Sequence, residues 1–502
     1  MRVVLVYPHM DRGDALGPSL ATSEHLGLGY LASAARSEGH DVLILNEELA
    51  EYDATTTVAR TLEFAPDVVG ISPVSLSMNR GLAYLGDVAR LSPRSRRVIG
   101  GHLASLCAQQ ILENEHHVEF VIEGDGERPF CALLRALSGE GKLEDVPSLS
   151  WREDGTIRRA APSPQVGLDE LLPPARDDLA YLVRIQGCRS ARILASRGCR
   201  FNCSFCTTPG FYGRKSRFRD PGLVIDEMEA IRAAYGADHF WFNDDLFIDG
   251  TPDNAAWVTR FASMIEGRGF TFRILCRADS FRGSNGELIE KLVRAGLRMV
   301  FLGLESGSQS ALKTFRKGTT VQQNLDVVRL LEAHELELQV GFIMFNPYST
   351  LDELAAGADF LREIGQLYRV LPLTRRLSVF PGTAIAQRLV VDGMITGIPY
   401  REPEACYSFV DGRIAVLADE LSEAYVANVA LDHALLTAFR GQDRIPDRAA
   451  EAAVNDLNHA EFCAILRGLE TAFDALTIRR AIRDWMERLA ELLESATLAS
   501  CP

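Results

Sequence analysis

Three cysteines lie within eight residues of this chain, at Cys199, Cys203 and Cys206, in a CxxxCxxC spacing. Thiolates are soft ligands that suit zinc or an iron-sulfur cluster, and a compact loop can turn all three sulfurs onto one site. A structural zinc site usually needs a fourth ligand close by, yet no second CxxC and no suitably spaced histidine follows before Cys276. A cubane cluster on three cysteines would instead leave one iron open to a substrate or cofactor. The alternative, three free cysteines in a core, is disfavoured by the tight spacing and the otherwise polar loop.

The composition is that of a globular protein of two or three domains, with 502 residues, 47% hydrophobic and 24% charged. Basic residues number 53 and acidic residues 68, and this net charge of -15 argues against nucleic acid as the main partner. No leader pattern and no apolar stretch of about 18 residues occurs, so we expect a cytoplasmic protein without membrane contact. In a reducing compartment, a cysteine cluster more often holds metal than forms disulfides.

Short apolar segments alternate with helical patterns over residues 1–140, starting with the segment at 2–7 and the helix at 27–38. This alternation predicts an α/β domain with a doubly wound parallel sheet, whose ligands bind beyond the carboxyl ends of the strands. The glycine-rich loops there suit a large polar ligand, although a scaffold with an empty crevice is the alternative. No GxGxxG or GxxxxGK[ST] supports a dinucleotide or triphosphate. The candidate binding residues in these loops are His9, Ser72, Gly100, Gly101, His102, Glu123 and Gly124.

A proline-rich segment at 141–185 is predicted to be a linker with a small hairpin around Asp154-Gly155. A second series of alternating strand and helix patterns follows, and it predicts a partial (β/α)6 barrel over residues 186–388. The last part of the chain, 389–502, is predicted to be a helical domain that caps the barrel or shapes the pocket. The expected barrel strands are 193–196, 240–243, 271–276, 299–302, 338–343 and 376–380.

Polar side chains gather after four successive barrel strands, where the chemistry of barrel enzymes is found. Any one of them could be a helix cap or a solvated loop residue, but their recurrence favours a shared site. These residues include Asn243, Asp244, Asp245, Arg277, Asp279, Glu305, Ser306, Asn346 and Tyr348.

In these motifs the chain resembles the radical S-adenosylmethionine (SAM) superfamily, and its first domain resembles the cobalamin-binding domain of one branch of that superfamily. The resemblance covers residues 1 to about 412. Besides the cysteine motif, it rests on residues 27–31 (GLGYL), 100–102 (GGH), 123–127 (EGDGE), 244–245 (DD), 277–279 (RAD), 303–307 (GLESG), 317–318 (KG) and 381–383 (PGT).

The resemblance implies a 4Fe-4S cluster whose open iron is chelated by SAM, which is cleaved to methionine and a 5'-deoxyadenosyl radical. It also implies that Phe205 lies near the adenine. The amino, carboxylate and ribose groups of SAM would be bound by Asp244, Asp245, Arg277, Glu305 and Ser306.

Two segments depart from the family pattern. Cobalamin domains that ligate cobalt with histidine have DxHxxG after the first strand, whereas this chain has Pro8-His9-Met10-Asp11-Arg12-Gly13, so that His9 is a possible ligand at the wrong spacing. Where the family often has Gly-Pro-Gly-Glu-Thr after the fifth strand, residues 345–350 are FNPYST. This second departure is expected to reflect the substrate.

The leading interpretation is a cobalamin-dependent radical SAM enzyme that methylates a carbon of a small molecule in secondary metabolism, with an external electron donor such as flavodoxin or ferredoxin. The first alternative is a cobalamin-free dehydration, epimerisation or rearrangement of a sugar-like substrate. Such a reaction needs an acid or base, for which Tyr212, His239, Glu305 and Tyr348 are candidates by position. The second alternative is a non-catalytic cobalamin or cluster sensor.

Overall fold

The structure is a computed structural model, and it describes residues 1–10, 24–49, 53–187, 189–281, 286–440, 448–471 and 474–499. Asp11, Arg12 and Gly13 of the first loop therefore lie outside the described residues.

The N-terminal unit is built on a seven-stranded sheet in the order β2-β1-β3-β4-β5-β6-β7. The first five strands pair in parallel, and β6 and β7 continue the sheet in antiparallel pairing. The strands are β1 (Arg2–Tyr7), β2 (Asp41–Asn46), β3 (Val68–Ile71), β4 (Arg96–Ile99), β5 (Phe120–Ile122), β6 (Leu149–Glu153) and β7 (Thr156–Arg159).

Helices cover both faces of this sheet, so its central strands are buried on both sides. Val3 and Leu5 of β1 pack toward helices α2 (Leu26–Ser37) and α7 (Glu127–Leu137). Val4 and Val6 point to the other face, covered by α3 (Ala54–Phe64), α4 (Met78–Leu91), α5 (His102–Leu106) and α6 (Ala108–Asn114). The doubly wound parallel sheet predicted from the alternating segments is confirmed.

The proline-rich segment at 141–185 does more than link two units. Its predicted hairpin at Asp154-Gly155 is present as β6 and β7, and this hairpin extends the first sheet through pairing with β5. The N-terminal sheet thus ends at Arg159, beyond the boundary expected at residue 140. Helix α8 (Asp177–Gln186) then leads to the second unit.

The second unit is a five-stranded parallel sheet in the order β14-β13-β12-β11-β8. Its strands are β8 (Ser190–Ile193), β11 (His239–Phe242), β12 (Thr271–Arg277), β13 (Leu297–Glu305) and β14 (Glu337–Phe342). The partial barrel is confirmed, but its expected sixth strand at 376–380 is reduced to one parallel bridge between Phe345 and Arg376. The short pair β9 (Ser196–Arg197) and β10 (Arg217–Phe218) flanks the cysteine loop.

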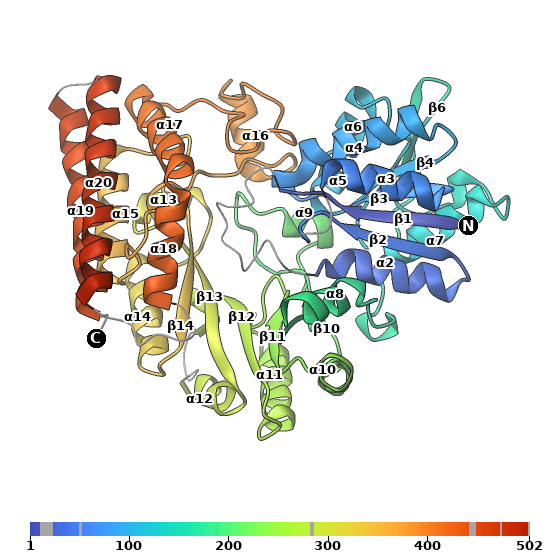
Figure 1. Cartoon of the computed structure of the whole chain (residues 1–502), viewed down its shortest axis with the longest axis horizontal. Helices are drawn as coiled ribbons and strands as arrows, with labels where there is room; N and C mark the ends of the chain where they lie inside the picture. The colour runs from blue at the N-terminus through green and yellow to red at the C-terminus, as the bar shows by residue number, and fades with distance from the viewer. Residues whose placement is uncertain are drawn as a thin grey trace.

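Side chains of the second sheet alternate between two environments, as a strand period of two requires. One set packs under the covering helices: α10 (Pro221–Tyr235), α11 (Pro252–Ile265), α12 (Gly286–Arg294), α14 (Val321–Glu332) and α15 (Leu351–Glu363). The other set faces the concave side, called the lumen below. Figure 1 shows this sheet between the N-terminal unit and the last helices.

The described residues from 412 onward form four helices, in agreement with the helical domain predicted over 389–502. They are α17 (Gly412–Ala427), α18 (Val429–Arg440), α19 (Arg448–Thr471) and α20 (Ala475–Ala499), and α19 packs on α15 of the barrel (Figure 1). No helix in the described ranges has the length and hydropathy to cross a membrane.

Candidate functional site

The cysteine loop runs from the end of β9 to helix α9 (Thr208–Tyr212), and Asp245 fastens it at both ends. One carboxylate oxygen of Asp245 accepts a hydrogen bond from the backbone N–H of Gly198 at 2.9 Å, directly before Cys199. The other accepts from the hydroxyl of Thr208 at 2.9 Å, two residues after Cys206. A single side chain beyond β11 therefore fixes the span that carries all three thiols.

Asp244, the neighbour of Asp245, holds the strand end that precedes the loop. Its carboxylate accepts from the N–H of Ala195 at 2.9 Å and from the hydroxyl of Ser196 at 2.7 Å. Burial raises the pKa of Asp244 to about 7, although these hydrogen bonds oppose the shift. In this arrangement Asp244 and Asp245 are positioning residues of the cysteine loop.

Arg277 lies directly against the cysteines. Its Nη1 donates to the Sγ of Cys203 at 2.8 Å, and its Nε donates to Asp279 at 2.7 Å. The guanidinium also covers the ring of Phe201, with Cζ 3.8 Å from the ring centroid, and donates to the backbone oxygen of Lys317. A buried cation that donates to a thiolate sulfur stabilises negative charge there, as an anionic cluster ligand requires.

Glu305 is the last residue of β13 and pairs with Phe342 of β14, and Ser306 follows it. The carboxylate of Glu305 accepts from the Nζ of Lys317 at 2.8 Å, and Lys317 is only 3% exposed. The backbone of Glu305 has a φ of 70°, at an irregularity in the pairing with β14. The hydroxyl of Ser306 accepts from the N–H of Ser308. Both predicted residues thus lie at the carboxyl edge of the sheet with protein partners already engaged.

The donor set fits an iron-sulfur cluster. Among the described residues all three thiols are free, and each is partly exposed. Burial raises the pKa of Cys199 to about 11, and the nearby thiolates of Cys206 and Cys203 add to that shift. Three sulfurs that repel one another as anions are stabilised by a shared metal centre. Phe205, between the second and third cysteines, packs edge-on against Phe315 with ring centroids 5.5 Å apart.

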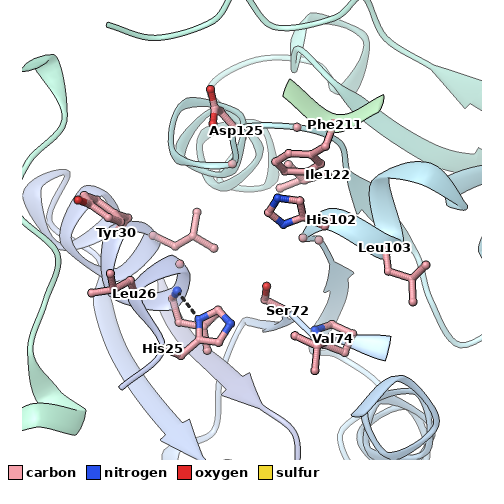
Figure 2. Close-up of a pocket in the computed structure, with 18 of the residues that line it drawn as sticks. His25, Leu26, Tyr30, Ser72, Val74, His102, Leu103, Ile122, Asp125 and Phe211 are labelled. Carbon is pink, nitrogen blue, oxygen red and sulfur yellow. Dashed lines mark hydrogen bonds between the residues drawn. The ribbon is translucent and has the colours of Figure 1, made fainter. Parts of the chain in front are cut away.

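A cavity of about 440 Å³ opens at the carboxyl ends of the N-terminal strands and faces the barrel. Its wall combines glycine-rich loops of the first unit with side chains from the second, of which Figure 2 shows Phe211 beside His102. A Cβ on Gly101, where φ is 91°, would lie 2.9 Å from the hydroxyl of Ser72, so the loop backbone itself forms that wall. Lining residues predicted from sequence are Ser72, Gly100, Gly101, His102, Gly124 and Tyr212.

The cavity also extends along the face of the first sheet, between the strands and the helices α2 and α7. Leu5, Val98 and Ile122 line it from the strands, and Leu28 and Phe130 line it from the helices. This arm is apolar, whereas the mouth carries polar groups. A ligand that fills the whole cavity therefore needs a polar body and an apolar extension.

His102 joins the two units at the cavity mouth. Its imidazole stacks on Phe211 of α9, with ring centroids 4.0 Å apart and planes 23° apart, and meets Tyr212 edge-on (Figure 2). Burial lowers the pKa of His102, which favours the neutral ring. Because α9 begins two residues after Cys206, one short segment carries the thiols and walls the cavity.

Charged groups also dock the two units. Arg197, two residues before Cys199, binds Asp125 at 2.7 Å and Glu127 at 2.6 Å, and Arg217 binds Asp125 at 2.8 Å. The carboxylates belong to the EGDGE segment, and all of these side chains are largely buried. Burial alone would lower the pKa of Arg197, but Glu127 and Asp125 raise it, so the guanidinium stays charged.

His25 is a cavity residue that the sequence did not single out. As the N-cap of α2, its Nδ1 accepts from the N–H of Leu28 at 3.0 Å (Figure 2). Burial lowers the pKa of His25 to about 4. A neutral ring whose Nδ1 accepts carries its hydrogen on Nε2, so His25 can donate from that nitrogen.

Two residues predicted to bind a ligand of the first unit, His9 and Glu123, do not line its cavity. His9 is outside the cavity lining and pairs with Glu48 at 3.2 Å, with its side chain 54% exposed. Glu123 is also outside it and binds Ser150 and Arg159 of the hairpin.

His239 is the first residue of β11, so it lies at the end of the barrel opposite the cysteine loop and contacts Thr271 at 2.8 Å. The strand expected at 240–243 already put His239 before the strand, so its choice as an acid or base candidate by position does not place it with the polar groups at the carboxyl ends. Tyr348 does follow β14, but its hydroxyl donates to Asp392 at 2.6 Å and Arg388 covers its ring.

Two family profiles match the chain: the radical SAM superfamily over residues 193–361 and the B12 binding domain over residues 16–134. An uncharacterized methyltransferase of Pyrococcus horikoshii is 27% identical over 406 residues, which span 80% of this chain and 86% of that protein. The cytidylyl-2-hydroxyethylphosphonate methyltransferase of Streptomyces wedmorensis is 26% identical over 399 residues, or 68% and 73% of the two chains.

Among solved structures, the cobalamin-dependent S-adenosylmethionine radical enzyme OxsB matches with a TM-score of 0.80 at 18% identity. The match covers 99% of this chain and 80% of that one. It confirms the expected fold, a doubly wound domain before a partial barrel with a helical C-terminal region. The chain thus carries a B12-binding domain and a radical SAM domain.

Proposed function

We propose that this chain, which pairs a B12-binding domain with a radical SAM domain, is a cobalamin-dependent radical SAM methyltransferase acting on a small molecule. One observation carries the proposal. The segment from Cys199 to Tyr212 holds the three thiols at one end and walls the cavity of the first unit at the other. Two cofactor sites built on one short segment can work on the same substrate atom.

Cys199, Cys203 and Cys206 would hold a 4Fe-4S cluster. When bound, cluster and SAM supply a 5'-deoxyadenosyl radical, and cobalamin supplies the methyl group. Arg277 donates to the Cys203 sulfur and shields it from water together with Phe201. Asp244 and Asp245, which follow β11, hold the loop through hydrogen bonds from Ser196 and Gly198.

The remaining SAM contacts are assigned to Phe205, Glu305 and Ser306. Glu305 and Lys317 together present one negative and one positive group beside the flat backbone at Gly303, where a Cβ would lie 2.8 Å from the Glu305 carboxylate. Such a surface suits the polar end of SAM, while the partly buried ring of Phe205 suits the adenine.

The cavity would hold cobalamin. His9 lies outside the lining, and the Nδ1 of His25 already caps α2. Ser72, Gly100, Gly101 and Gly124 supply backbone and hydroxyl groups at the mouth, and the apolar arm along the sheet receives the extended part of the ligand.

Methyl transfer is favoured over a cobalamin-free rearrangement and over a sensor for two reasons. The relatives named above are methyltransferases, and the cavity joins directly to the cysteine segment. Of the four candidates for a general acid or base, Tyr212 is the one that lines this cavity. Burial raises the pKa of its hydroxyl. A cytoplasmic location and reduction by flavodoxin or ferredoxin complete the proposal.

Anaerobic purification with cobalamin in the medium tests it. We expect absorption bands of both a 4Fe-4S cluster and a corrinoid, and 5'-deoxyadenosine when SAM and a reductant are added. A cluster that cleaves SAM in a protein with no affinity for corrinoid would refute the methyltransferase. Corrinoid binding without SAM cleavage would instead support the sensor.

A further inference from the structure

One row of side chains crosses the lumen of the barrel, and it is rich in positive charge. Backbone pairing puts Trp241 of β11 opposite Arg192 of β8 and opposite Arg273 of β12. Pairing then continues from Arg273 to Met299 and from Met299 to Glu337. Residues paired in this way share a face of the sheet. Their neighbours Ala191, Phe240, Phe272, Val300 and Leu338 pack in the core under the helices, so this row faces the lumen.

Both guanidinium groups lie against the same indole. The Cζ of Arg273 is 3.0 Å from the centroid of the Trp241 ring, and the Cζ of Arg192 is 5.1 Å from it. These two distances place the Cζ atoms at most about 8 Å apart, where two like charges repel. The pKa of Arg273 is lowered to about 9, chiefly by burial and further by Arg192.

Neither guanidinium has a carboxylate within ion-pair distance among the described residues. Arg192 donates to the amide oxygen of Asn243 at 2.7 Å, while its Nε, like the Nε1 of Trp241, has no partner. Arg273 donates only to the sulfur of Met299, at 3.7 Å. The acid of the row, Glu337, is two strands from Arg273, or roughly 10 Å at the usual strand spacing.

The nearest acid to Arg192 is already in use. Glu24 accepts from the backbone N–H of Arg192, but its carboxylate pairs with Arg176 at 2.8 Å. Glu227 pairs with Arg176 and with Arg219, which completes a balanced group of two acids and two bases. The two guanidinium groups therefore have no carboxylate within ion-pair distance among the described residues, although Glu337 at longer range raises the pKa of Arg273 against the effect of burial.

The row is accessible and adjoins the cavity of the first unit. Arg192, Trp241 and Arg273 are half-buried, and Phe301, one step further along the lumen, is 37% exposed. Asn243, which holds Arg192, lines the cavity of the first unit. Along β12, Arg273 lies four residues before Arg277, which contacts Cys203, or roughly 13 Å at the usual rise per residue.

We propose that Arg192, Trp241 and Arg273 bind an anionic group, a carboxylate or a phosphate, of the small-molecule substrate. Guanidinium groups pair with either oxyanion, and the indole adds a flat apolar surface beside it. This inference rests on the proposed function for its placement of substrate in the lumen. It adds the substrate class, which is an acid.

The test is a binding titration that needs neither SAM cleavage nor cobalamin. Inorganic phosphate and benzoate are added separately at constant chloride and ionic strength, and the fluorescence of Trp241 is followed. The Trp241→Phe variant identifies its share of the signal. We expect a saturable change with at least one anion and none with neutral benzamide. The stronger of the two anions indicates a phosphate or a carboxylate on the substrate.

Arg192→Met and Arg273→Met should each weaken anion binding roughly 10- to 100-fold. Arg273→Lys should retain most of it. Arg90→Met, the same change at a side chain that is 68% exposed on α4, serves as the matched control and should bind as wild type. Circular dichroism checks folding, and Arg273→Gln replaces the methionine variant if that variant does not fold. No saturable signal, or equal binding in all variants, would overturn the site.

A second arm separates substrate from SAM, which also carries a carboxylate. If the row binds substrate, SAM alone gives no saturable Trp241 signal, and the variants still form 5'-deoxyadenosine. If SAM saturates the signal and the variants lose SAM cleavage, the assignment to substrate is wrong. Failure of the proposed function itself is distinguishable, because wild type would then lack cluster, corrinoid or cleavage whatever the anion titration gives.

Discussion

The cysteine loop and the cavity of the first unit differ in how their polar groups are used. Around the loop, Asp244, Asp245, Arg277 and Glu305 all bind other parts of the protein. At the cavity mouth, the His102 ring stacks on Phe211 and meets Tyr212 edge-on, and glycine backbone forms much of the wall. The side chains around the cysteine loop hold the three sulfurs in place, whereas the wall of the cavity leaves polar groups available to a large ligand.

This difference teaches that polar residues after successive strands can serve a site indirectly. Asp245 touches the residues that flank the cysteines rather than an open space. The barrel's guanidinium groups without an ion-pair partner among the described residues are those of Arg192 and Arg273, which face the lumen against Trp241. Substitutions should therefore affect the two regions separately, with the largest effects at the thiols.

Cys203→Ala should abolish the cluster and the formation of 5'-deoxyadenosine, because three thiolates are needed to hold the iron. The same variant should bind corrinoid as wild type does, since no cysteine lines the cavity within the described residues. Iron analysis, product chromatography and absorption spectra measure this. Cys463→Ala, a partly exposed cysteine on α19, is the matched control and should retain all three properties. Joint loss of cluster and corrinoid would show that the regions are not separable.

Arg197→Met should lower the free energy of unfolding by about 3–5 kcal/mol, because it leaves Glu127 buried without its cation and Asp125 with Arg217 alone. Urea denaturation of the apoprotein measures the loss. Arg128→Met removes an exposed pair with Glu170 on the same helix as Glu127 and should cost less than about 1 kcal/mol. Equal effects of the two substitutions would contradict the docking role of Arg197.

His102→Ala should weaken corrinoid retention about 3- to 10-fold through loss of the stacked wall with Phe211. SAM cleavage without substrate should stay near wild type, since His102 contacts none of the cysteines. Equilibrium dialysis against cobalamin measures the first property. His116→Ala, an exposed histidine of the same unit, is the control. An unchanged corrinoid affinity would remove His102 from the proposed site.

Acidification should destabilise the cavity region through His25. Its folded pKa is lowered to about 4 by burial, below the usual value of 6.5, so the unfolded chain takes up the proton first. The stability due to neutral His25 is present above pH 6.5 and is lost as pH falls toward 4. Between pH 7 and pH 5 we expect wild type to lose about 2 kcal/mol more than His25→Asn, which keeps a capping acceptor. Parallel pH profiles of the two proteins would contradict this assignment.

The sequence was sufficient to predict the two βα series, the cysteine motif and most of the cavity loops, because periodicity and glycine spacing are local properties. It named His239 as a candidate by loop position, although both the expected strand at 240–243 and the observed β11 put this residue at the amino end of the strand. Arg197, Phe211 and His25 were missed because their roles depend on docking between the units. Arg192 and Arg273 did leave a signal: each is a charge inside an otherwise apolar strand pattern.

The most direct test of the central claim is a single anaerobic sample of wild-type protein, expressed with cobalamin and supplied with SAM and a reductant. We predict bound corrinoid in stoichiometric amount, together with a 4Fe-4S cluster and 5'-deoxyadenosine. A protein that forms the cluster and cleaves SAM but binds no corrinoid at any concentration tested would contradict the claim that the cavity beside Cys199, Cys203 and Cys206 holds the second cofactor.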